Sequence, residues 1–226
     1  MERDRRWLLQ RIGVLSSLPL LGSSLVRAAE TCVRTARQTR GPFYPVSQMP
    51  DSDADLTVIP GKTEKASGQV AVVTGRVRDL DCRQLGGAKV EIWQACASGR
   101  YDHPRDRNPA PLDPHFQYWG EVVTAEDGSF SFRTIKPGAY PFQPGWVRPP
   151  HIHFQIKAAG YSALVTQLYF EGEALNDKDR ILGALAPDQR RFVIVPFVKG
   201  SADEIKGRFE IVLGPAKAGG TTPGIE

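Results

Sequence analysis

The chain of 226 residues, with 41% hydrophobic and 24% charged residues, has the size and composition of one globular domain with an added segment at either end. Its formal charge is +4 and its pI is about 9.0, which by themselves would favour an acidic partner. The first 28 residues, however, hold five arginines against two acidic residues and so carry +3 of that charge. The remaining +1 gives no support to a nucleic-acid-binding protein.

The first segment has the pattern of an export signal. Arg5 and Arg6 form a twin-arginine pair, an apolar stretch follows as far as Val26, and the small Ala28 suits cleavage. This pattern predicts a twin-arginine-type signal peptide over residues 1–28 and an exported, periplasmic protein with no stable membrane span after processing. An amphipathic helix or a membrane anchor at the N-terminus is the alternative.

Residues 29–68 are rich in Pro and Asp and show no helical period, so they are predicted to form an extended N-terminal arm. From residue 69 to residue 214 the pattern changes to short β-branched or aromatic runs separated by turn signals such as Asp127-Gly128. The predicted strands are 70–77, 89–93, 120–124, 129–133, 152–156, 164–170, 191–196 and 207–213. A short helical stretch is predicted near residues 177–185, and the tail 215–226 is expected to be flexible. The sequence therefore predicts an all-β domain, an antiparallel β-sandwich with long loops and little helix.

The three cysteines, at positions 32, 82 and 96, lack the paired CxxC spacing of a zinc site. An oxidising compartment permits one disulfide. We expect it to join Cys82 and Cys96, because these two flank the ends of one predicted strand.

Two of the four histidines stand one residue apart, as His151 and His153, shortly after Arg148 and two prolines. In a strand such residues point to the same face, so both imidazoles can bind one metal while Ile152 packs into the opposite layer. Imidazole suits iron, copper and zinc alike, so the pair identifies no metal, and a surface or core pair of histidines is the plain alternative. The prolines end regular sheet pairing and aim Arg148 towards the same place, where its charge requires an anionic ligand or substrate.

Tyr101 and Tyr140 both lie in loop-like contexts. As tyrosinates they would supply the anionic oxygens that the arginine and the two imidazoles require. A lone tyrosine in such a loop is usually a packed aromatic side chain with a hydrogen-bonded hydroxyl. Taken one at a time, therefore, the two tyrosines leave both interpretations open.

Six motifs occur in one order: Gly41–Pro45, Val90–Ala95, Gly99–Tyr101, Ala110–Pro114, Phe132–Gly138 and Arg148–Phe154. Together they resemble the intradiol ring-cleavage dioxygenases, most nearly the β subunit of protocatechuate 3,4-dioxygenase. The resemblance runs from about residue 41 to residue 213, which would make residues 69–214 a catalytic dioxygenase domain.

The resemblance implies a non-haem iron(III) centre. Tyr101 and Tyr140 match the two tyrosinate ligands of the family, and His151 and His153 match its two imidazole ligands. Two anionic phenolates stabilise ferric over ferrous iron, in keeping with that metal.

The resemblance also implies catalytic roles. Tyr140 matches the family's tyrosinate that leaves the metal and takes a proton from the catechol. Arg148 matches an arginine that stabilises negative charge, and Gln167 matches an active-site glutamine. The implied reaction uses O₂ to open a catechol, protocatechuate-like, between its two hydroxyl-bearing carbons and yields a cis,cis-muconate-type dicarboxylic acid. Where close relatives have Tyr-Pro-Trp, this chain ends the motif in Phe142, a smaller ring that is expected to widen the pocket. A homo-oligomer, or a hetero-oligomer with a homologous chain, is implied as well.

Two rival interpretations remain: a non-catalytic, exported β-sandwich binding module, or the same site filled by copper or zinc. The other conspicuous side chains receive plain interpretations. His103 and His115 are expected to be solvated or hydrogen-bonded, with His103 near enough to Tyr101 to border the pocket, and residues 177–180 are expected to be a solvated charged face. Trp93 and Trp119 are expected in the core or at an interface.

Overall fold

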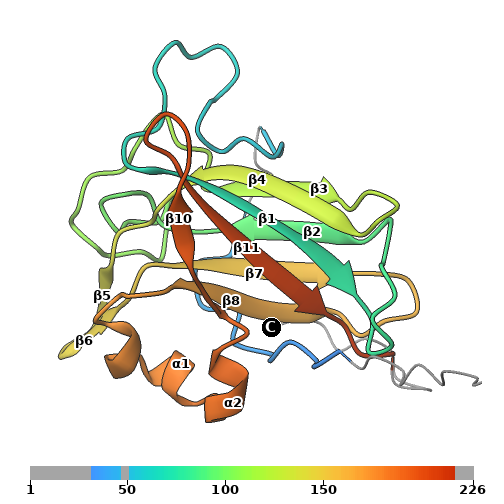
Figure 1. Ribbon diagram of the computed structural model, residues 1–226. Helices are drawn as coiled ribbons and strands as arrows, with labels where there is room; N and C mark the ends of the chain where they lie inside the picture. The colour runs from blue at the N-terminus through green and yellow to red at the C-terminus, as the bar shows by residue number, and fades with distance from the viewer. Residues whose placement is uncertain (1–31, 47–50, 217–226) are drawn as a thin grey trace, which may run out of the picture.

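The computed structural model describes residues 32–46 and 51–216, and strands dominate these parts of the chain (Figure 1). The strands are β1 Val70–Arg78, β2 Lys89–Trp93, β3 Trp119–Val123, β4 Ser129–Ile135, β5 Tyr140–Gln143, β6 Trp146–Arg148, β7 His151–Lys157, β8 Leu164–Phe170, β9 Ile194–Val195, β10 Phe197–Lys199 and β11 Ile205–Val212. The helical elements are the 3₁₀ turn Asn176–Lys178 and the short helices α1 Arg180–Gly183 and α2 Pro187–Arg190. The expected all-β fold with little helix is confirmed, while the predicted signal peptide and most of the predicted tail lie outside the described residues.

Two sheets lie one upon the other, with the strand order β10-β11-β1-β4 in one and β3-β2-β7-β8-β9 in the other (Figure 1). A small third sheet, β5-β6, extends from one end as a hairpin that the sequence patterns did not predict. The arrangement is a β-sandwich, but two of its strand pairs, β1 with β11 and β8 with β9, run parallel rather than antiparallel. The C-terminal strand β11 returns to lie beside β1, a long-range contact that no local pattern specifies.

The core fills the space between the two main sheets. Strand β1 turns Val73 and Val77 inward, and β7 turns Ile152, Phe154 and Ile156 towards them, as the two-residue period of a strand requires. The ring of Phe154 contacts that of Phe209 from β11, with centroids 5.0 Å apart. Each such fully buried apolar side chain stabilises the fold by about 1.5–3 kcal/mol.

The five-stranded sheet is covered on its outer face as well, since six of the seven residues of β7 and all of β8 are buried. Part of that cover is the arm segment, which we define as residues 32–46 and which runs beside β8 (Figure 1). The backbone N–H of Gln38 donates to the carbonyl of Val165 at 2.9 Å, so the arm segment satisfies the edge of β8 that β9 leaves open. Phe43 and Tyr44 of the arm segment pack against the outer cluster that contains Trp93 and Val165, which shields this face from water.

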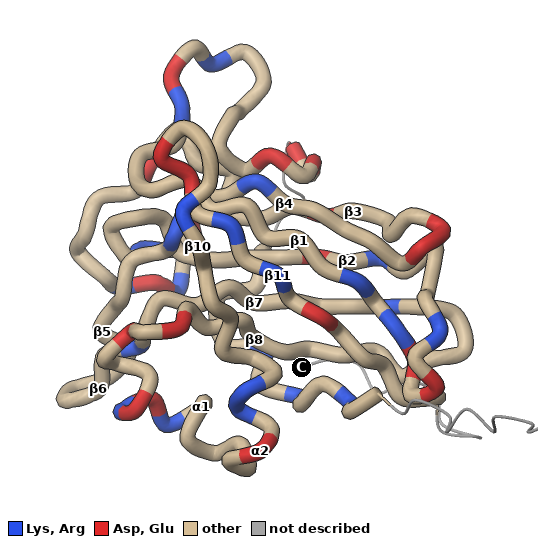
Figure 2. Tube along the Cα trace, viewed as in Figure 1, with Lys and Arg blue, Asp and Glu red and all other residues tan. Residues whose placement is uncertain are grey.

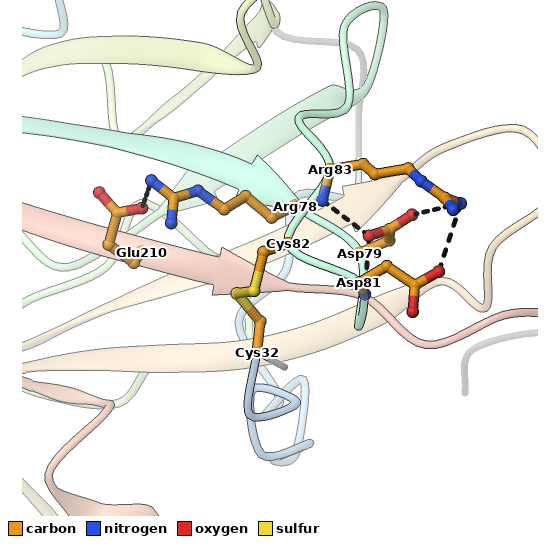
Figure 3. The surroundings of a disulfide bond; sticks show 7 residues. All are labelled: Cys32, Arg78, Asp79, Asp81, Cys82, Arg83 and Glu210. Atoms are coloured by element: carbon orange, nitrogen blue, oxygen red, sulfur yellow. Dashed lines mark hydrogen bonds and ion pairs between the residues drawn. A yellow bond between two sulfur atoms is a disulfide. The ribbon is translucent and has the colours of Figure 1, made fainter. Parts of the chain in front are cut away.

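The predicted disulfide is wrong. Cys32 of the arm segment is bonded to Cys82 in the turn after β1 (Figure 3). Cys96 is a buried free thiol. Cys82 precedes β2 in the chain and Cys96 follows it, and the five residues of that strand alone separate its ends by about 13 Å. Two bridged cysteines need Cα atoms within about 7 Å, so a position at either end of one strand argues against pairing rather than for it.

The turn that carries Cys82 is rigid. The carboxylate of Asp79 accepts the backbone N–H groups of Asp81 and Arg83, each at 2.9 Å, and Cys82 itself has a positive φ of 62° (Figure 3). The arm segment is therefore bonded to a fixed point of the sandwich.

Charged residues of both signs lie along the four-stranded sheet (Figure 2). Arg76 pairs with Asp127, and Arg78 and Arg208 both pair with Glu210. Among the described residues, the helices are too short and too polar to cross a membrane.

Candidate active site

The outer face of β7 presents the two histidines of the His-x-His motif. His151 and His153 are each 2% exposed, and their ring centroids lie 4.9 Å apart. Trp93 of β2 stacks on His153 with the rings 4.8 Å apart and 9° from parallel, which fixes that imidazole against the sheet. Trp93 is thus a buried side chain, as expected, but one that packs against the site.

A backbone contact sets the tautomer of His151. Its Nδ1 lies 2.7 Å from the carbonyl oxygen of Pro149, which can only accept, so Nδ1 carries the proton and donates. The lone pair on Nε2 is then free, and Nε2 lies 3.5 Å from the hydroxyl of Tyr101. Such a second-nitrogen hydrogen bond is the usual way in which proteins orient a metal-binding imidazole.

Two glycines bring the two tyrosine loops together. A Cβ on Gly99 would lie 2.3 Å from the carbonyl oxygen of Ala139, and a Cβ on Gly138 would lie 2.5 Å from the nitrogen of Gly99. The two backbones can touch only because both positions lack a side chain. Tyr101 and Tyr140, each two residues further on, are held with their rings 5.5 Å apart and nearly perpendicular.

Burial keeps the four side chains neutral in the protein alone. It raises the pKa of Tyr101 well above its ordinary value, and repulsion between two ionised phenols, those of Tyr101 and Tyr140, would raise it further. Burial also raises the pKa of Tyr140, although the positive charge of Arg148 acts in the opposite direction. The pKa values of His151 and His153 lie well below normal because of burial and the charge of Arg148.

This donor set fits a metal cation. The two imidazoles are neutral, and the two buried phenols can ionise only beside a positive charge. A bound cation would offset the cost of ionising both phenols. The orphaned, buried Nδ1 of His153 and the oriented Nε2 of His151 are both nitrogen donors of the kind that iron accepts. Among the described residues, no group of three or more His, Cys, Asp or Glu side chains is placed to hold a metal.

Arg148 lies beside these groups, because it ends β6 directly opposite Tyr140 in β5. The guanidinium is buried, and its Nε donates to the Oδ2 of Asp179 at 2.7 Å. Its Nη2 donates to the Oε1 of Gln167 at 2.7 Å and to the hydroxyl of Tyr169 at 3.2 Å. A full positive charge is thus fixed at the edge of the histidine–tyrosine cluster.

The arm segment forms one wall of the site. The side chain of Gln38 accepts the backbone N–H of Gln167 at 2.9 Å and donates to the hydroxyl of Tyr169 at 3.1 Å. Further along, the ring of Phe43 packs 4.7 Å from that of Tyr101. The arm segment therefore contacts both the polar residues around the guanidinium and the tyrosine side.

A cleft of about 340 Å³ opens next to Tyr140. Phe43 and Phe142 line it, and their rings lie 6.1 Å and 6.5 Å from that of Tyr140. The other wall includes Arg105, Asp106 and Arg107, and the carboxylate of Asp106 is bonded to backbone N–H groups, whereas both arginines are exposed. The cleft thus combines apolar surface with two positive charges beside the cluster.

All six predicted site residues come together in the structure. Four form the histidine–tyrosine cluster and the other two, Arg148 and Gln167, are hydrogen-bonded to each other next to it. His103 is buried and packs against Phe43, so it borders the cluster, whereas His115 is paired with Glu64 away from it.

A family model described as "Dioxygenase" (Dioxygenase_C) matches residues 39–215. The protocatechuate 3,4-dioxygenase β chain of Burkholderia cepacia is 39% identical over 183 residues, which cover 78% of either chain. The chain belongs to the intradiol dioxygenase family. It is an oxidoreductase of that type.

Solved intradiol dioxygenases share the fold. The intradiol ring-cleavage dioxygenase of Tetranychus urticae superposes with a TM-score of 0.63 and 26% identity, covering 81% of this chain and 96% of the other. The 3-chlorocatechol 1,2-dioxygenase of Rhodococcus opacus 1CP superposes with a TM-score of 0.65 and 25% identity, covering 80% of this chain and 73% of the other. A 6-chlorohydroxyquinol 1,2-dioxygenase of Cupriavidus pinatubonensis is 35% identical over 164 residues. The match covers 66% of the present chain and 55% of that relative.

Three residues that hold the site of this dioxygenase in place were not identified from the sequence. Asp179 was assigned to a solvated charged face, yet it is 2% exposed and bonded to Arg148, so that interpretation is wrong for this residue. Its position two residues before Ile181, at the start of a helical stretch, is an N-cap signal that could have revealed it. Gln38 and Asp106, whose carboxylate accepts the backbone N–H of Tyr101 at 2.7 Å, carry no comparable signal.

Proposed function

We propose that this chain is an iron(III)-dependent intradiol dioxygenase that opens a protocatechuate-like catechol with O₂ between its two hydroxyl-bearing carbons. Tyr101, Tyr140, His151 and His153 would hold the non-haem iron. The product would be a cis,cis-muconate-type dicarboxylic acid, since both atoms of O₂ enter the new carboxyl groups.

One observation carries the proposal. Two phenols and two imidazoles meet in a buried cluster in which the Nε2 of His151 faces the hydroxyl of Tyr101 at 3.5 Å. Family membership supports the same reaction type. Phenolate oxygens favour a ferric ion over zinc, which more often takes Cys, His or carboxylate ligands.

Iron(III) bound there would supply a Lewis acid that favours the dianion of the catechol and makes its ring reactive towards O₂. The phenolate of Tyr140 would accept one catechol proton and become a phenol, a change that its high pKa in the buried site favours. Arg148 would stabilise the negative charge that develops on the ring, because its guanidinium is already fixed and needs no reorganisation. Gln167 would hold one side of that guanidinium.

The cleft beside Tyr140 supports a catechol that carries a carboxylate. Phe43 and Phe142 offer apolar surface to an aromatic ring, and Arg105 and Arg107 offer positive charge to an anionic substituent. A carboxylated catechol should therefore have a lower KM than unsubstituted catechol. The difference should shrink in about 0.5 M salt, because both arginines are exposed and salt screens their charge.

The test is oxygen uptake by the iron-loaded chain over a panel of catechols, with the product identified as opened between the hydroxyls or beside them. Tyr140→Phe should retain iron and lose most of the turnover, and Tyr161→Phe, which removes a hydroxyl bonded to Asp79, should retain full activity. His151→Ala should lose much of the iron, whereas His115→Ala, at a surface ion pair, should keep it.

Colour separates the alternatives. Tyrosinate-to-iron(III) charge transfer gives visible absorption, which a zinc-bound or metal-free chain lacks, and metal analysis distinguishes copper. A colourless, inactive protein after iron loading would contradict the proposal and favour a binding module.

We further propose that the chain is exported through a twin-arginine signal and works in the periplasm. The Cys32–Cys82 disulfide supports an oxidising compartment. Replacement of Arg5 and Arg6 by lysine should leave the protein in the cytoplasmic fraction, and unchanged export would refute the signal.

We also propose an oligomer, with copies of itself or with a homologous chain, since a relative is named as a β chain. Light scattering on the purified protein should give a mass above the 24.9 kDa of one chain, alone or after addition of the homologous partner.

A further inference from the structure

Among the described residues, one carboxylate, that of Asp179, balances the charge of Arg148. Its ion pair with Asp179 has an Nε–Oδ2 distance of 2.7 Å, and the two side chains are 2% and 0% exposed. The other partners of the guanidinium, Gln167 and Tyr169, are neutral. A buried cation of this kind is tolerated only with a compensating charge and good geometry, and Asp179 supplies both.

We propose that Asp179 is a positioning residue for Arg148. It anchors the Nε edge of the guanidinium, so that Nη2 reaches Gln167 and Tyr169 and the charge stays beside Tyr140. The inference rests on the proposed catalytic role of Arg148. Asp179 itself touches no substrate.

The carboxylate divides its two oxygens between two tasks. Oδ1 accepts the backbone N–H groups of Ile181 and Leu182, at 3.1 Å and 2.8 Å, and thereby caps α1. Oδ2 accepts from Arg148. The first set of bonds fixes the carboxylate to the backbone, and the second transmits that fixed position to the guanidinium.

This division makes asparagine a sharp probe. In Asp179→Asn the amide oxygen can still cap α1, but the amide nitrogen then faces the Nε–H of Arg148, donor against donor. The substitution thus removes the charge and the Arg148 contact while it keeps the helix cap. Asp179→Glu is the complementary probe, because it keeps the charge but moves it by one methylene group.

The experiment compares the iron-loaded wild type with Asp179→Asn, Asp179→Glu, Arg148→Gln and the double variant Arg148→Gln/Asp179→Asn. Asp177→Asn is the matched control, because Asp177 belongs to the same charged run but is exposed. The measurements are kcat and KM from oxygen uptake, the visible charge-transfer band, and the urea midpoint of unfolding.

We expect Asp179→Asn and Asp179→Glu to lower kcat by about 10- to 100-fold, with KM changed by less than about threefold and the visible band unchanged. The double variant should have the kcat of Arg148→Gln alone, because Asp179 acts only through that side chain. Asp177→Asn should match the wild type.

Two results would overturn the inference while the wild type is active: Asp179→Asn and Asp179→Glu with kcat within threefold of the wild type, or a loss that adds in full to that of Arg148→Gln. A purely structural role would give the first result, with a lower urea midpoint and no specific loss of kcat. A wild type that opens no catechol would instead refute the proposed function, and with it the role of Arg148.

Discussion

Removal of the Cys32–Cys82 disulfide tests how the arm segment is held. The perturbation is the double substitution Cys32→Ser/Cys82→Ser. The bond closes a loop with a sequence separation of 50 residues. The chain-entropy model gives about 4 kcal/mol of stabilisation for a loop of that length, because the unfolded chain without the bond gains the corresponding freedom. The turn at Cys82 is already fixed by Asp79, so the folded state should lose little else.

The assay is urea unfolding of the wild type and the variant, with and without reductant. With a slope of about 2 kcal/mol/M, the midpoint should fall by about 2 M in the variant. Reductant should lower the urea midpoint of the wild type to that of the variant and leave the midpoint of the variant unchanged. This comparison is the internal control for any destabilisation caused by the serine side chains themselves. A difference below about 1 kcal/mol, or an equal effect of reductant on both proteins, would refute the reasoning.

Hydrogen exchange gives a second readout of the same change. The amide of Gln38, bonded to the carbonyl of Val165, should lose protection when the arm segment is released. Amides between β1 and β11 should keep theirs, because those strands are paired over eight residues independently of the arm segment. Equal protection of Gln38 in both proteins would show that the arm segment is held by its hydrogen bonds alone.

Two further predictions concern the histidines. Gly41 and Gly61 have φ values of +70° and +81°, so alanine at either position should lower the free energy of unfolding by about 1–2 kcal/mol. Only at Gly41 would the added Cβ approach His153, at 3.3 Å from its Cε1. Gly41→Ala should therefore shift the visible band of the iron-loaded protein and Gly61→Ala should not; identical spectra would contradict the contact. In the metal-free protein, burial and Arg148 depress the pKa values of His151 and His153, so below the ordinary value of about 6.5 only the unfolded chain binds these protons. As the pH is lowered below that value, the free energy of unfolding should fall by up to about 1.4 kcal/mol per pH unit for each histidine. Equal urea midpoints at pH 7.5 and 5.5 would exclude this linkage.

Local patterns were enough to predict the strand that carries the histidines. Alternation around Ile152 predicts which side chains of β7 share a face, and the structure places His151 and His153 together on the outer one. The same reasoning could not find the partner of Arg148, because Asp179 is 31 residues away and lies within a run that looks solvated. Its burial depends on contact between α1 and the hairpin of β5 and β6, where the guanidinium of Arg180 lies 5.1 Å from the ring of Trp146.

The disulfide fails for a related reason. Spacing along the chain suggested Cys82 and Cys96, but a strand between two cysteines carries them apart, and the partner is Cys32 of the arm segment. Likewise, the parallel pairing of β11 with β1 depends on contacts about 130 residues apart, such as Gly207 with Val73, and no periodicity contains that information.

The geometry of the site and the packing of the core depend on one register. His153 lies opposite Trp93 of β2 and opposite Gln167 of β8, while its neighbour Phe154 points into the core. A slip of β7 by one residue would turn the imidazoles into the apolar layer and Phe154 out into the polar cluster, so the buried aromatic side chain also enforces the position of the histidines. Substitutions in the core face of β7 should consequently disturb the histidine–tyrosine cluster as well as the free energy of unfolding, because both faces belong to the same seven residues.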